Sequence, residues 1–209
     1  MGRGGPDPHP CYESQPQVAL TDYHGAFDLS LFLALNRDGG ALLDGAMRLF
    51  STRSFGVGCG LVLLTLVAVR ERRAALVALL ALALALLVSD FLGAHLVRPL
   101  FARMRPCYAL PPGSFRWLAP AANASSLPSL HAANTFALAQ VATRSWRRLL
   151  APAYLVAVLV SVSRVYVGVH WPTDVLAGAL FGTLAGALGT FAARRLLERS
   201  PRSPARAER

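Results

Sequence analysis

Long apolar runs are the feature that most restricts how this chain can fold. They lie at about 54–69, 74–97, 131–143, 149–163 and 174–193. Each run is long enough, or nearly so, to cross a hydrocarbon layer of roughly 30 Å. Because a backbone in lipid must satisfy its own hydrogen bonds, such runs should be helices. We therefore predict an all-α fold, a polytopic membrane helical bundle with five clear spans.

The composition and one short run refine this prediction. With 54% apolar and 15% charged residues, the chain is too apolar for an ordinary soluble domain. The run at 131–143 reaches span length only if the polar segment Pro128–His131 is included. A polar end is tolerable where it lines a cavity within the protein, so this end of the span is expected to face the protein interior.

The segments outside the clear spans divide the chain. Residues 26–50 hold two apolar stretches around a polar turn, so they predict either an interfacial helical hairpin or a distorted first membrane helix. This gives about six helices within a membrane-embedded domain at 26–195. Residues 1–25 lack the apolar core of a signal peptide and predict a flexible leader. Residues 196–209 are basic and contain proline, which predicts a disordered tail.

Arginine accounts for all 21 basic residues, and the formal net charge is +10. The arginines form short clusters between apolar runs rather than one basic face, which argues against nucleic-acid binding. By the positive-inside rule, the clusters at 70–73, 144–148 and 194–209 mark cytoplasmic span ends. We therefore expect an integral protein of the plasma (inner) membrane, with segments 98–130 and 164–173 facing outward, toward the periplasm.

Polar segments interrupt the chain at the outward ends of the spans. One places Arg98 and Arg105 seven residues apart, about two helical turns, so both are expected on one helix face. The next places Ser129 and His131 where a helix should begin, with the hydroxyl in the cap position. Because the first amide groups of a helix are unpaired, such an end attracts an anion.

The third polar segment carries Arg164, His170 and Asp174, and it ends one span and begins the next. Asp174 follows His170 by four residues, across a proline that can start a helix, so the carboxylate can reach the imidazole. A histidine held in this way is fixed in one tautomer and becomes more nucleophilic. Membrane topology brings all three segments to one face.

This set of side chains suits phosphoryl transfer. Three guanidiniums supply forked, permanently charged donors for a tetrahedral oxyanion, one histidine can attack, and the other can deliver a proton. Positioning and charge stabilisation then suffice without a metal or other cofactor, and the arginines would repel a divalent cation. The three cysteines are widely separated and odd in number, so they predict neither a metal cluster nor a disulfide framework.

Together the three segments resemble the signature of the type 2 phosphatidic acid phosphatase superfamily. Its motifs are Lys-x6-Arg-Pro, Pro-Ser-Gly-His and Ser-Arg-x5-His-x3-Asp, in that order. The chain reads Arg98-x6-Arg105-Pro106, Pro128-Ser129-Leu130-His131 and Ser163-Arg164-x5-His170-x3-Asp174. The resemblance covers about 90–193. It implies that 26–195 is a phosphatase domain, a helical bundle with its site near one membrane face.

The resemblance also implies a role for each matched residue. His170 would attack phosphorus to form a phosphohistidine, with Asp174 orienting and charging it. His131 would protonate the leaving oxygen and later help to activate water. The groups that hold the phosphoryl oxygens would be Arg98, Arg105, Arg164, the Ser129 hydroxyl and the Leu130 amide.

Two residues depart from the family pattern. Arg98 stands where the family usually has lysine, which preserves the charge but replaces a point donor with a planar fork. Leu130 stands where the family usually has glycine. An amide donor remains, but we expect the branched side chain to crowd the phosphate and to restrict the backbone.

The leading functional prediction is hydrolysis of a lipid phosphate or diphosphate, since a site at the membrane face receives the headgroup while the tail stays in lipid. The candidate substrates are a polyprenyl diphosphate such as undecaprenyl diphosphate, phosphatidic acid, phosphatidylglycerol phosphate and lipid A. Two alternatives stay open, a lipid phosphotransferase with the same intermediate and a non-catalytic phospholipid-binding membrane protein. The expected partners are the lipid phosphate and the bilayer, and the sequence leaves the oligomeric state open.

Overall fold

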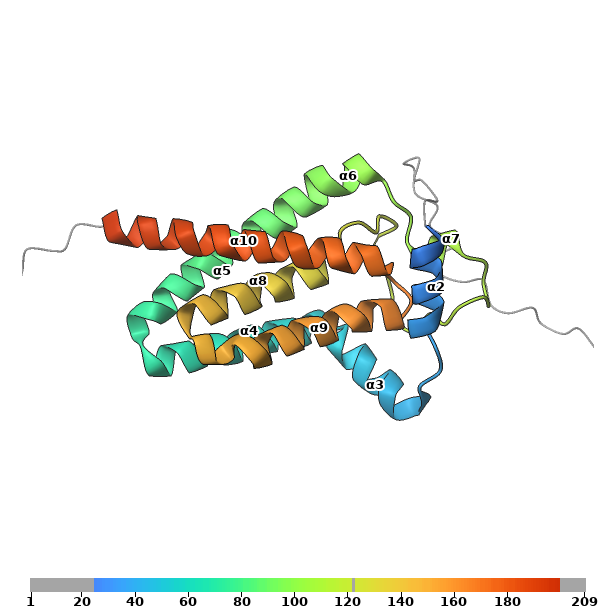
Figure 1. Ribbon diagram of the computed structural model, residues 1–209, viewed down its shortest axis with the longest axis horizontal. Coiled ribbons are helices and arrows are strands. Elements are labelled where there is room, and N and C mark those ends of the chain that lie inside the picture. Colours follow the sequence, from blue (N-terminus) through green and yellow to red (C-terminus); the bar gives the residue numbers. More distant parts are fainter. Residues whose placement is uncertain (1–24, 122, 200–209) are drawn as a thin grey trace, which may run out of the picture.

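The computed structural model describes residues 25–121 and 123–199, which form a bundle of helices (Figure 1). In this part of the chain, β-structure is limited to an isolated bridge between Met104 and Ser125. The prediction of an all-α fold is therefore confirmed. The predicted leader falls outside the described residues except for residue 25. Of the predicted tail, residues 196–199 belong to the last helix rather than to a disordered segment, and residues 200–209 lie outside the described part.

The helices follow the apolar runs of the sequence. In chain order they are α2 (Ala26–Leu35), α3 (Gly40–Phe50), α4 (Arg53–Arg70), α5 (Arg72–Leu92), the π-helical turn η1 (Gly93–Val97), α6 (Arg98–Phe101), α7 (Pro106–Ala109), α8 (Leu130–Ser145), the 3-10 turn η2 (Arg147–Leu149), α9 (Leu150–Tyr166) and α10 (Pro172–Arg199).

Four continuous helical segments of the described chain are long and apolar enough to cross a membrane. They are Arg53–Arg70, Arg72–Phe101, Arg147–Tyr166 and Pro172–Glu198. The fifth predicted span forms α8, which has 16 residues and packs against α4, α5, α9 and α10 (Figure 1). Because protein rather than lipid surrounds α8, it does not need the long uninterrupted apolar surface of the others.

Residues 26–50 form two short helices rather than one distorted span. The break between α2 and α3 is held by Asn36, whose amide nitrogen donates to the carbonyls of Arg116 and Tyr166 at 2.7 Å. Its oxygen accepts from the Arg116 amide at 2.6 Å. Gly40 then takes a positive φ of 80°, which glycine adopts without steric cost. As a result, α2 runs across the end of the bundle instead of along it (Figure 1).

The helix that carries Arg98 does not continue to Arg105. It ends at Phe101, because Ala102 has a positive φ of 43° and its amide donates back to the Arg98 carbonyl at 2.9 Å. Arg105 lies in extended backbone just before α7, as expected for a residue that precedes a proline. The expectation that both arginines share one helix face is therefore wrong, and a turn of the chain separates them.

Glycines allow α8 and α10 to approach very closely. A Cβ on Gly182 would lie 1.9 Å from the carbonyl oxygen of Ala133, and a Cβ on Gly178 would lie 2.4 Å from that of Ser129. Small residues at such crossings are how helices gain contact area in a bilayer. The contact places the starts of α8 and α10 side by side.

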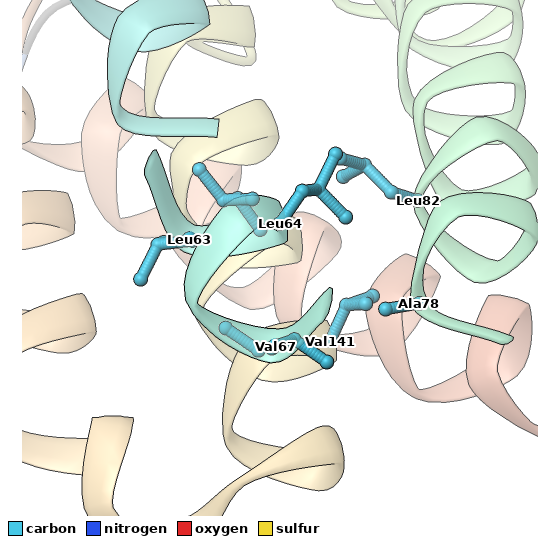
Figure 2. A pocket seen from close by; sticks show the side chains of 8 residues that line it. Leu63, Leu64, Val67, Ala78, Leu82 and Val141 are labelled. Atoms are coloured by element: carbon cyan, nitrogen blue, oxygen red, sulfur yellow. The ribbon is translucent and has the colours of Figure 1, made fainter. Parts of the chain in front are cut away.

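Toward the opposite end of the bundle, α4, α5 and α8 pack against one another through aliphatic side chains. Figure 2 shows a small cavity between α4, α5 and α8, bordered by Leu63, Leu64, Val67, Ala78, Leu82, Leu138, Val141 and Ala142. Such a surface offers no hydrogen bond or charge to a polar ligand. The chemistry of the molecule therefore belongs to the other end.

Replacing Gly182 by alanine tests the packing of α8 against α10. The added Cβ meets backbone, which cannot rotate away, so we expect the unfolding free energy to fall by about 2 kcal/mol. Gly58→Ala is the matched control, because a Cβ on this α4 glycine meets nothing within 4 Å. Thermal unfolding in a single detergent measures both variants, and equal midpoints would contradict the close packing.

Candidate active site

Three segments meet at the end of the bundle that α2 covers: the loop after α6, the start of α8, and the turn between α9 and α10. The Ser129 amide donates to the Asp174 carbonyl at 3.0 Å, which joins the starts of α8 and α10. The Trp171 indole donates to the Met104 carbonyl at 2.8 Å, which joins the loop to the turn. The structure thus brings together the polar segments that topology was expected to unite.

His170 and Asp174 form a buried pair. Gly168, at φ 85°, turns the chain after α9, and Pro172 begins α10, so the intervening His170 faces inward. Its Nδ1 lies 3.4 Å from Asp174 Oδ2, and the two side chains are 2% and 0% exposed. The carboxylate thus fixes the Nδ1 side of the ring and leaves Nε2 as the reactive atom.

The surroundings of His170 keep its ring neutral. Burial lowers its pKa well below the ordinary value, and the positive charges of Arg105, Arg164 and Arg98 lower it further. A neutral imidazole retains the lone pair that an attack on phosphorus requires.

Arg105 is held against His170 by the loop on which it lies. Its Nη1 lies 2.7 Å from His170 Nε2 and donates to the Val169 carbonyl at 2.9 Å. Its Nε and Nη2 donate to the backbone and side-chain oxygens of Asn123 at 2.6 and 3.0 Å. Burial lowers the pKa of Arg105 to about 10, so it is still a cation at neutral pH.

Three predicted phosphate-binding residues present buried donors that no described residue pairs. They are the Nε atoms of Arg98 and Arg164 and the hydroxyl of Ser129. The Arg164 Nη1 donates to the Ser51 carbonyl at 2.8 Å and to the Ser51 hydroxyl, which positions the rest of this guanidinium. Buried donors without acceptors are costly, so they mark a site suited to a multivalent anion.

His131 belongs to the same cluster. It is the second residue of α8, and the charges of Arg164, Arg105 and Arg98 act on its imidazole. Its electrostatic interaction with His170 places both histidines around one site.

The Leu130 side chain contacts the helix that leads to Arg98. As the first residue of α8, Leu130 lies with its Cδ2 only 2.7 Å from where a Cβ on Gly93 would stand. It therefore occupies space that the glycine of α5–η1 leaves open. Among the described non-glycine residues, positive φ is confined to Ala102, so Leu130 also has an ordinary backbone conformation. The expectation that Leu130 crowds the phosphate and restricts the backbone stays a prediction.

The sequence analysis missed several residues that hold the site. Asp28 and Arg103 form an ion pair beside Asp174, with Arg103 Nη1 2.8 Å from Asp174 Oδ1. Ser126 donates to Asp174 Oδ2, and Ser51 positions Arg164 as described above. Two features of the sequence could have indicated them. Asp28 is an acidic residue within an apolar stretch, and Arg103 is an arginine of the outward segment that belongs to no motif.

The donor set around His170 is mostly cationic. Within the described residues, no group of three His, Cys, Asp or Glu side chains is placed to hold a metal ion. The donors that converge on His170 are guanidiniums and hydroxyls, which bind anions.

The chain resembles curated phosphatases of lipids. A family model described as the PAP2 superfamily matches residues 51–196. An undecaprenyl-diphosphatase of Sulfolobus acidocaldarius is 35% identical over 165 residues, which cover 75% of this chain and 74% of that protein. A lipid A 4'-phosphatase of Bacteroides thetaiotaomicron is 33% identical over 134 residues, which cover 61% of this chain and 59% of that protein.

Two solved structures are similar to this chain. The crystal structure of Aquifex aeolicus LpxE superimposes with a TM-score of 0.64 at 29% identity, covering 79% of this chain and 95% of that one. A PAP2 type phosphatidylglycerolphosphate phosphatase from Bacillus subtilis gives a TM-score of 0.57 at 22% identity, covering 86% and 90%, and supports the fold. All three motifs lie within the matched residues, so the chain belongs to the PAP2 superfamily and is a lipid phosphatase of that superfamily.

Proposed function

We propose that this protein hydrolyses a lipid diphosphate or lipid phosphate through a phosphohistidine on His170. The observation that carries the proposal is the gathering of buried donors around a neutral histidine whose Nε2 faces Arg105 rather than the carboxylate. Arg105 reaches that atom, while Arg98, Arg164 and Ser129 hold donors that lack a protein acceptor among the described residues. A phosphoryl group supplies acceptor oxygens and an electrophilic phosphorus at one point.

The proposed reaction has two steps. The Nε2 lone pair of His170 forms a bond to phosphorus while the bond from phosphorus to the leaving oxygen breaks. His131, which takes up a proton when the negative phosphoryl group offsets the nearby arginines, gives that oxygen the proton. Water then attacks the phosphohistidine, His131 takes a proton from the water, and the P–N bond breaks to release inorganic phosphate. The Arg105 N–H that lies against Nε2 would donate to a phosphoryl oxygen during both steps.

The substrate that we favour is a polyprenyl diphosphate of the undecaprenyl type. The 35% identical relative is named an undecaprenyl-diphosphatase, and its alignment covers three quarters of both chains. The site lies at the end of the bundle, where a headgroup can enter while its hydrocarbon tail stays in the bilayer. A lipid A phosphate is the second candidate, because the 33% identical relative is a lipid A 4'-phosphatase.

We further propose that the site faces the outside of the plasma membrane. The arginine-rich span ends gather at the opposite end of the bundle, where the Arg70 guanidinium lies 5.3 Å from the centre of the Trp146 ring. At the same end, Arg194 donates to the Arg144 carbonyl at 3.2 Å. Clustered arginines mark a cytoplasmic end, so the active site would lie on the other side.

His170→Ala should reduce phosphate release from undecaprenyl diphosphate by at least about 10³-fold, because the attacking atom is lost. The matched control is His95→Ala, since His95 is exposed on η1 and its Nδ1 lies 3.0 Å from the Phe91 carbonyl. Release is measured without added metal, alongside transfer of labelled phosphate to other lipids. Full activity in His170→Ala would refute the mechanism, and labelled lipid in place of free phosphate would identify a phosphotransferase.

Leu130→Gly should give no large gain in phosphate release, because the leucine side chain already has space against Gly93. We expect a lower unfolding midpoint instead, since glycine costs about 1 kcal/mol in a helix relative to alanine. The reciprocal change, Gly93→Ala, should destabilise the wild type but not a Leu130→Ala background. A strong rate gain in Leu130→Gly would favour the non-catalytic, phospholipid-binding alternative for the natural chain.

Reporter fusions test the orientation. A reporter that is active only outside the cytoplasm should be inactive when fused at residue 72 and active when fused at residue 115. The reason is that residue 72 follows the arginine-rich end of α4, whereas residue 115 lies between α7 and α8, at the end of the bundle that holds the site. A cytoplasmic residue 115 would reverse the proposed orientation.

A further inference from the structure

A buried chain of charges leads from the N-terminal helix to the reactive histidine. Arg103 Nη2 lies 2.5 Å from Asp28 Oδ2 on α2, and Arg103 Nη1 lies 2.8 Å from Asp174 Oδ1 on α10. The three side chains are 7%, 6% and 0% exposed, so solvent screens them little. Asp174 in turn lies beside His170 Nδ1.

Asp28 also binds the backbone from which Asp174 projects. Its Oδ1 accepts from the Thr173 amide at 2.9 Å, and its Oδ2 accepts from the Thr173 hydroxyl at 2.6 Å. The Thr173 hydroxyl also accepts from Arg103 Nη1 at 2.7 Å. Asp28 therefore fixes both the cation that faces Asp174 and the first turn of the helix that carries it.

Arg103 shares its positive charge between Asp28 and Asp174. The guanidinium of Arg103 is divided between two carboxylates, so neither is fully neutralised by it. Although burial raises the pKa of Asp28, the hydrogen bonds from Thr173 and Arg103 bring it below the ordinary value, so Asp28 is an anion. If Asp28 were uncharged, Arg103 would neutralise more of the charge on Asp174 and weaken the attraction of Asp174 for the His170 N–H.

We propose that Asp28 is a positioning residue for the phosphoryl-transfer reaction: through Arg103 and Thr173 it holds Asp174 in place and keeps it basic enough to activate His170. This inference rests on the proposed function. The family model begins at residue 51, so α2 lies outside the matched region. The inference thus makes α2 part of the active site rather than an accessory to the bundle.

Other charges face His170 and must be held constant in any test. These charges belong to five different segments. They are Arg98 of α6, Arg105 between α6 and α7, His131 of α8, Arg164 of α9 and Asp174 of α10. Removing Asp28 deletes one anion from this mostly positive surrounding. The cationic form of His170 then becomes less favourable, and protonation of His170 requires a lower pH.

The test is Asp28→Asn, which preserves shape and removes charge. We expect kcat to fall about tenfold with little change in KM, as for residues that orient a ligand or nucleophile from behind. The acid limb of kcat/KM should move to lower pH. Orthovanadate, which mimics the transferring group and bonds to a histidine nitrogen, should bind about tenfold more weakly, a readout that needs no turnover.

Asp44→Asn is the matched control. Asp44 of α3 is also an N-terminal carboxylate paired with an arginine, since it accepts from Arg116 Nη2 at 2.6 Å and from the Tyr166 hydroxyl at 2.6 Å. Its contacts hold α3 and do not reach Asp174. We expect this variant to lose thermal stability while the acid limb and the vanadate affinity of the folded protein stay unchanged.

Arg103→Lys provides a second variant if Asp28→Asn folds poorly. A lysine is a point cation that cannot bridge two carboxylates as a fork does, so the same loss of kcat and vanadate affinity is expected. Wild-type kcat, acid limb and vanadate affinity in folded Asp28→Asn would overturn the inference while leaving the proposed function intact. Vanadate binding by a wild type that releases no phosphate would count against the proposed function, and the vanadate comparison would still decide the role of Asp28.

Discussion

The buried carboxylate of Asp174 is the contact on which the site depends. It accepts from Arg103 and from the Ser126 hydroxyl, and it lies 3.4 Å from His170. Its backbone carbonyl accepts from the Ser129 amide, where α8 begins. A fully buried carboxylate is very costly without such donors. The loop, the start of α8 and the turn before α10 must therefore be in place together, which couples assembly of the bundle to assembly of the site.

Positive charge exceeds negative charge around this carboxylate. Five guanidiniums, those of Arg53, Arg98, Arg103, Arg105 and Arg164, act around the site, and so do three carboxylates, those of Asp28, Asp90 and Asp174. The excess of two charges matches a phosphoryl dianion. Like charges in a poorly screened site repel each other, so an anion that enters is favoured by every guanidinium at once. Burial keeps His170 neutral and the same charge excess adds to this effect, so the cations that favour an anion also favour the nucleophilic form of the histidine.

Sequence reasoning predicted the parts of this arrangement that depend on local spacing. The four residues from His170 to Asp174 span a helix start, and that spacing alone puts the carboxylate near the imidazole. It failed at Ala102, where a left-handed residue ends the helix before Arg105 and no local pattern announces the turn. It also missed Asp28 and Arg103, because their partners lie some seventy residues or more away along the chain. Long-range charge pairing is set by how helices pack, which single-residue spacing does not encode.

Leu130 shows how a departure from a family pattern is judged by where the side chain goes. A motif position usually held by glycine suggests that a larger side chain must intrude on the phosphate. Here the backbone of α8 directs the leucine toward α5, and Gly93 provides the space that it fills. In this chain the small residue is Gly93 on the neighbouring helix. The amide at the start of α8 is still present as a donor. The position of this leucine therefore requires that Gly93 stay small.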